Sequence, residues 1–96
     1  MIVTKAMIEK SCQMAEKAVM DQDLDLYKKY LAYQIEIGRL PETFTIPRDE
    51  VLLIRLKALA IEMDYTTPEM VEEAKKWLIA HGYEDEIEEA IGCRGE

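Results

Sequence analysis

Histidine and cysteine, the side chains most often used as nucleophiles, general bases and metal ligands, are scarce in this chain. It holds one histidine, His81, and two cysteines, Cys12 and Cys93. A structural zinc site would need all three with a carboxylate, and the close ligand pairs typical of such sites are missing. A cysteine–histidine nucleophile pair has the same weakness. We therefore expect no metal site, and we expect His81 to cap or pack a helix C-terminus.

The acidic run from Asp21 to Asp25 has the alternating aspartates that open a calcium-binding loop. Counted from Asp21, however, the sixth residue is Leu26 and the twelfth is Ala32, where such a loop needs glycine and glutamate. The run therefore predicts an interhelical turn with an aspartate cap and no calcium site.

No arrangement of residues indicates catalysis. Acid pairs such as Glu72 and Glu73 are consecutive, and consecutive residues of a helix point in different directions. They do not form a general acid and a general base that face one cleft. The glycines stand at predicted helix ends and form no phosphate-binding loop. We expect neither an enzyme nor a bound cofactor.

Hydrophobic periodicity and helix-capping residues predict an all-α fold, a compact bundle of four main helices and a short fifth helix. We expect one domain over residues 1–96, with helices over residues 5–20, 24–37, 48–63, 68–81 and 84–91. Gly38, Gly82 and Gly92 are the expected C-terminal stops. Residues 39–47 alternate polar and apolar between two prolines, but a single short strand has no partner, so we expect a long crossing loop.

The helix predicted after Pro47 has apolar residues on two faces, separated by thin lines of charge. One face contains Leu52, Leu53, Leu56, Leu59, Ala60 and Met63, and the other contains Val51, Ile54, Ala58 and Ile61. Because both faces must be buried, we expect this helix to be central to the bundle or to an oligomer.

Charge is distributed unevenly along the chain. The net charge is −8, and residues 58–96 hold eleven of the twenty acids but only three of the twelve bases. Eight of these acids form what we call the acidic set: Glu69, Glu72, Glu73, Glu84, Asp85, Glu86, Glu88 and Glu89. The set either serves helix dipoles and solubility, or docks a basic partner. Direct binding to nucleic acid is disfavoured because phosphates repel such a surface.

The second predicted helix also carries two apolar stripes. One of them, which we call the tyrosine face, consists of Leu26, Tyr30, Tyr33 and Ile37. Tyrosine is enriched in binding surfaces, so this face predicts a protein interface, most simply a homodimer. The alternative is that the loop over residues 39–47, with Leu40, Phe44 and Ile46, folds back over the face and completes a monomeric core.

The compartment and function follow from these features. No apolar run approaches the ~18 residues of a membrane span, and the first residues lack the layout of a signal peptide, so we expect a cytoplasmic protein with reduced thiols. We expect a small acidic, non-catalytic protein–protein interaction module or regulatory subunit. The alternative is an acidic mimic of nucleic acid that inhibits a nucleic-acid-binding protein, as a mobile element or phage uses against host defence.

Overall fold

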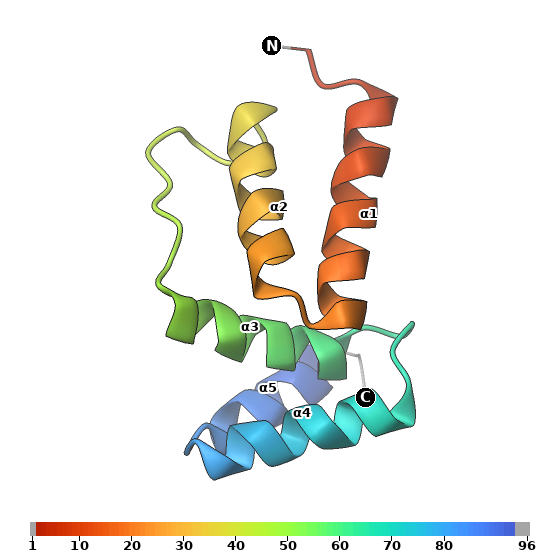
Figure 1. Cartoon of the computed structure of the whole chain (residues 1–96), viewed down its shortest axis with the longest axis vertical. Coiled ribbons are helices and arrows are strands. Elements are labelled where there is room, and N and C mark those ends of the chain that lie inside the picture. Colours follow the sequence, from red (N-terminus) through yellow and green to blue (C-terminus); the bar gives the residue numbers. More distant parts are fainter. Residues whose placement is uncertain (1, 94–96) are drawn as a thin grey trace. The chain divides into compact units, whose positions relative to one another are not determined.

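The regular structure of this protein is helical throughout the part that the computed structural model describes, residues 2–93 (Figure 1). Five helices follow one another along the chain: α1 (Lys5–Asp21), α2 (Leu24–Glu36), α3 (Asp49–Glu62), α4 (Pro68–Ala80) and α5 (Glu84–Cys93). The prediction of an all-α fold with a short fifth helix is confirmed, and every helix boundary lies within two residues of its expected position.

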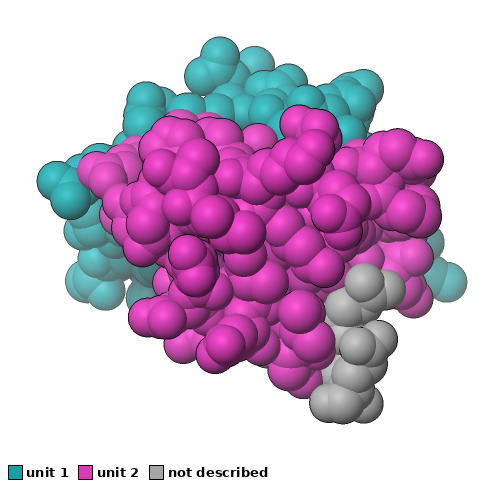
Figure 2. Space-filling view, turned by 90° about the horizontal axis from the view of Figure 1, so that it is seen from below, with its two compact units in different colours: residues 1–49 teal, residues 50–96 magenta. Residues whose placement is uncertain are grey.

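The chain divides into two compact units, shown in teal and magenta in Figure 2. The first unit is Met1–Asp49 and contains α1, α2 and the connecting segment, by which we mean residues 37–48. The second unit is Glu50–Glu96 and contains α3 from its second residue onward, α4 and α5. Our expectation of a single domain stays a prediction.

Polar side chains set the helix starts where the sequence indicates them. The side chains of Thr4, Asp23 and Thr67 accept hydrogen bonds from backbone N–H groups three residues later, at 3.2, 3.1 and 3.2 Å. Each satisfies one N–H group that the first turn of a helix leaves without a partner. Gly38 and Gly82 follow the ends of α2 and α4 with φ of +79° and +83°, the left-handed conformation expected of C-terminal stops.

Gly92 does not end α5 as expected. The helix continues through it to Cys93, and Gly92 is not among the residues with positive φ. Glycine adopts helical dihedral angles as readily as left-handed ones, so its presence alone does not force a stop.

The core of the first unit lies between α1 and α2. Ser11, Ala18 and Val19 are buried on α1, and Tyr27, Leu31 and Gln34 are buried on α2. The Ser11 hydroxyl donates a hydrogen bond to Oε1 of Gln34, so the two buried polar side chains satisfy each other. Ile8 and Cys12 remain exposed, although helical periodicity puts them on the same side of α1 as these buried residues.

The connecting segment runs along the side of α2 that faces away from α1 (Figure 1). It contains no strand, as predicted. At its start the backbone N–H groups of Arg39 and Leu40 both donate to the carbonyl oxygen of Gln34, at 2.9 and 3.1 Å. Beyond its end Asp49 forms an ion pair with Lys28 of α2 at 2.6 Å, and this hydrogen bond raises the pKa of Lys28. Both ends of the segment are therefore tied to α2.

Both apolar faces of α3 contain buried residues. Leu52, Leu56 and Ala60 are buried on one face, and Ala58 and Ile61 on the other. Among the helices of the described chain, α3 has the most buried residues, as expected for a helix with two apolar faces.

Two glycine substitutions test the account of the helix ends. Gly82→Ala should lower the free energy of unfolding by about 1 kcal/mol, because a Cβ atom disfavours the left-handed conformation. Gly92→Ala should raise it by a few tenths to about 1 kcal/mol, because alanine is the better helix former. An added Cβ meets nothing within 4 Å at either position, so urea denaturation of the two variants isolates the backbone effect. If both substitutions changed the free energy of unfolding in the same direction, this account of the two helix ends would be contradicted.

Candidate functional site

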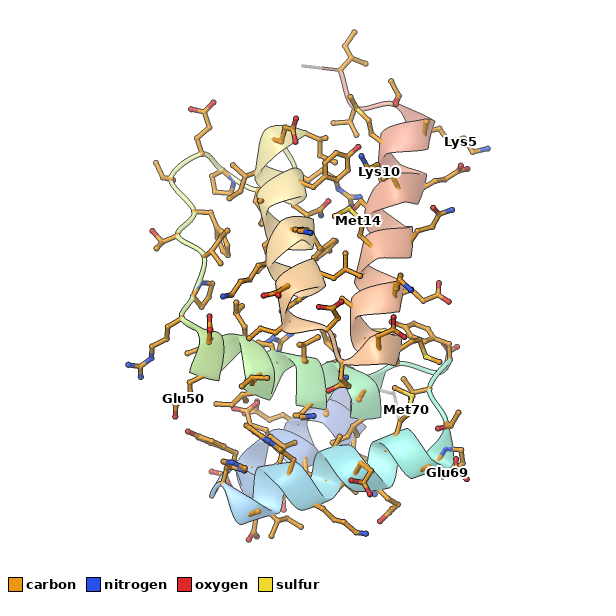
Figure 3. The ribbon with its side chains drawn as sticks, in the orientation of Figure 1. Lys5, Lys10, Met14, Glu50, Glu69 and Met70 are labelled. Carbon is orange, nitrogen blue, oxygen red and sulfur yellow. The ribbon has the colours of Figure 1, made fainter. Side chains whose placement is uncertain are left out.

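The acidic set lies on two helices, with three residues on α4 and five on α5. Seven of the eight are exposed, and Glu86 is half-buried. Figure 3 shows Glu69 at the start of α4. Within residues 2–93 the only ion pair of the set joins Glu72 to Lys75 at 3.8 Å, a weak surface contact. Most of the negative charge is therefore not neutralised by neighbouring bases.

The charge belongs to one unit. Twelve acids and five bases give the second unit a net charge of −7, whereas eight acids and seven bases give the first a net charge of −1. Charge concentrated in this way produces a negative potential around the second unit and attracts basic partners over a Debye length, about 8 Å at physiological salt.

Helix dipoles account for only half of the acidic set. Glu69 lies in the first turn of α4, and Glu84, Asp85 and Glu86 lie in the first turn of α5, where a carboxylate stabilises the helix. The other four residues lie beyond the first turn, where this effect has fallen off: Glu72, Glu73, Glu88 and Glu89. These four need an explanation other than the dipole.

The tyrosine face is only partly available as a surface. Leu26, Tyr30 and Tyr33 are half-buried, but Ile37 is only 1% exposed and belongs to the core. Ile37 is the C-cap residue of α2 and the first residue of the connecting segment, so it adds no exposed area to the tyrosine face.

The two tyrosines also have partners inside the first unit. Lys10 of α1 places its Nζ 4.7 Å from the centre of the Tyr33 ring, and its side chain is on the α2 side of α1 (Figure 3). The Tyr30 ring stacks on that of Tyr27, with centroids 6.0 Å apart. Leu40, Phe44 and Ile46 of the connecting segment are half-buried too, as the alternative of a covering loop requires. The interface reading of this face stays a prediction.

A cluster of aromatic and charged side chains in the second unit was only partly predicted. The His81 ring stacks on Trp77 at 3.9 Å, and its Nδ1 lies 2.8 Å from the Trp77 carbonyl oxygen at the C-terminus of α4. This is the capping and packing role expected from the four-residue spacing. Tyr83 donates a hydrogen bond from its hydroxyl to Glu50 at 2.6 Å, and Lys57 lies 5.7 Å from the Trp77 ring. The contacts that Glu50 and Lys57 make in this cluster depend on tertiary packing, and no local sequence signal indicates them.

Lys57 is a half-buried lysine whose pKa is shifted by its surroundings. Burial lowers its pKa, and the nearby Glu73 carboxylate opposes this effect without cancelling it. The charged ammonium is thus less well solvated in the folded protein than in the unfolded chain.

Three further features bear on function: metal-binding clusters, membrane-spanning helices and similarity to known proteins. Within residues 2–93 no three histidine, cysteine or acidic side chains are grouped so that they could hold a metal ion. None of the helices in that range has the length and apolar character needed to cross a membrane. No family model, curated protein or solved structure matches the chain.

The lowered pKa of Lys57 predicts a pH-dependent effect of Lys57→Met. Below that pKa the buried charge disfavours folding, so at pH 7 the variant should be more stable than the wild type. As pH rises towards 10.5, the unfolded chain binds more protons at this site than the folded protein does, the wild type gains stability, and the difference shrinks. Urea denaturation at several pH values measures this difference in stability between the variant and the wild type.

Lys76→Met is the matched control, because Lys76 is an exposed lysine of α4. It should show no comparable dependence on pH. A Lys57→Met variant that is less stable than the wild type at pH 7 would contradict the prediction, because the charge would then favour folding.

Proposed function

We propose that this protein is a non-catalytic protein–protein interaction module that binds a basic protein surface through the acidic set. The observation that supports this most is the position of Glu72, Glu73, Glu88 and Glu89, four exposed carboxylates beyond the helix turns where the dipole would explain them. Exposed charge of one sign speeds association with an oppositely charged partner and excludes like-charged ones.

An exposed apolar residue shares a face of α4 with one of these carboxylates. Ile79 of α4 is 52% exposed, the highest value for a large apolar residue inside a helix of the described chain. Its spacing puts it on the same helix face as Glu72 and Lys76. Charged contacts alone give speed and specificity more than affinity, so an apolar contact in such a surface supplies binding free energy that salt does not screen.

The second candidate function is inhibition by mimicry of nucleic acid. It is favoured by the density of charge on α5, where five of the six residues 84–89 are acidic. Closely spaced carboxylates carry the negative charge that a basic, phosphate-binding groove attracts. Competition with nucleic acid distinguishes the two candidate functions. Nucleic acid displaces a mimic from its target, but it does not displace a module that binds elsewhere on a basic protein.

We further propose that the protein acts in the cytoplasm with reduced thiols and without a cofactor. The two cysteines are 81 residues apart in sequence, and the side chain of Cys12 is a free, exposed thiol. Cys93 lies at the end of α5.

A charge-neutralised variant tests the proposal. The triple variant Glu73→Gln, Glu88→Gln and Glu89→Gln should lose most of the partner that the wild type retains in affinity purification from the source lysate at about 0.05 M salt. The wild-type complex itself should weaken steeply by about 0.5 M salt, because exposed charges are then screened. Mass spectrometry identifies the partner, and nuclease treatment in parallel shows whether nucleic acid competes.

The matched control is Glu9→Gln, Glu16→Gln and Glu36→Gln in the first unit. It removes three exposed glutamates and the same amount of charge, so it should retain the partner. Equal loss in both variants would show that only net charge matters. A partner that resists high salt would contradict docking through the acidic set and would favour the tyrosine face.

A further inference from the structure

We draw no further inference here: the strongest candidate, the surface patch of the first unit where Lys10 of α1 lies over Tyr33 of α2 and the half-buried Tyr30 adjoins it, carries none because nothing in the structure shows what covers it.

Discussion

Gln34 is the residue on which the first unit depends. Its side chain accepts a hydrogen bond from Ser11 on α1, and its main-chain carbonyl accepts two from Arg39 and Leu40 in the connecting segment. A buried polar pair stabilises only one alignment of two helices, because any other leaves a buried donor or acceptor without a partner. The same residue thus fixes the register of α1 on α2 and the direction in which the chain leaves α2. Ala18 and Val19 on α1 complete the buried face next to this pair.

The helices could be predicted from local signals because those signals agree with one another. Thr67 before Pro68, and Gly82 after the last apolar position, mark both ends of α4, and the structure has these caps where the sequence puts them. Gly92 was misjudged because glycine permits a helix stop without requiring one, and the four residues printed after it include no proline. The Ser11–Gln34 bond had no such local signal: the residues are 23 apart, and neither is unusual for its helix.

The candidate surfaces were predictable to different degrees for a physical reason. Charge is read directly from sequence, and seven of the eight residues of the acidic set are exposed, because burying an unpaired carboxylate is costly. Apolar stripes are ambiguous, because periodicity shows that a face is apolar without showing what covers it. The residues of the tyrosine face share one stripe in the sequence but differ in the structure. Ile37 is buried, whereas Tyr30 and Tyr33 are half-buried and have aromatic or cationic neighbours. Lys57 beneath Trp77 was missed because its environment is built by two helices.

The uneven charge limits where copies of this protein can meet. The first unit has a net charge of −1, whereas the acidic set belongs to a unit with a net charge of −7. Self-association through the acidic unit would bring like charges together, so an interface between copies is least opposed where the charge is nearly balanced. The tyrosine face belongs to that nearly balanced unit, so the expected homodimer and the docking of a basic partner do not compete for one surface.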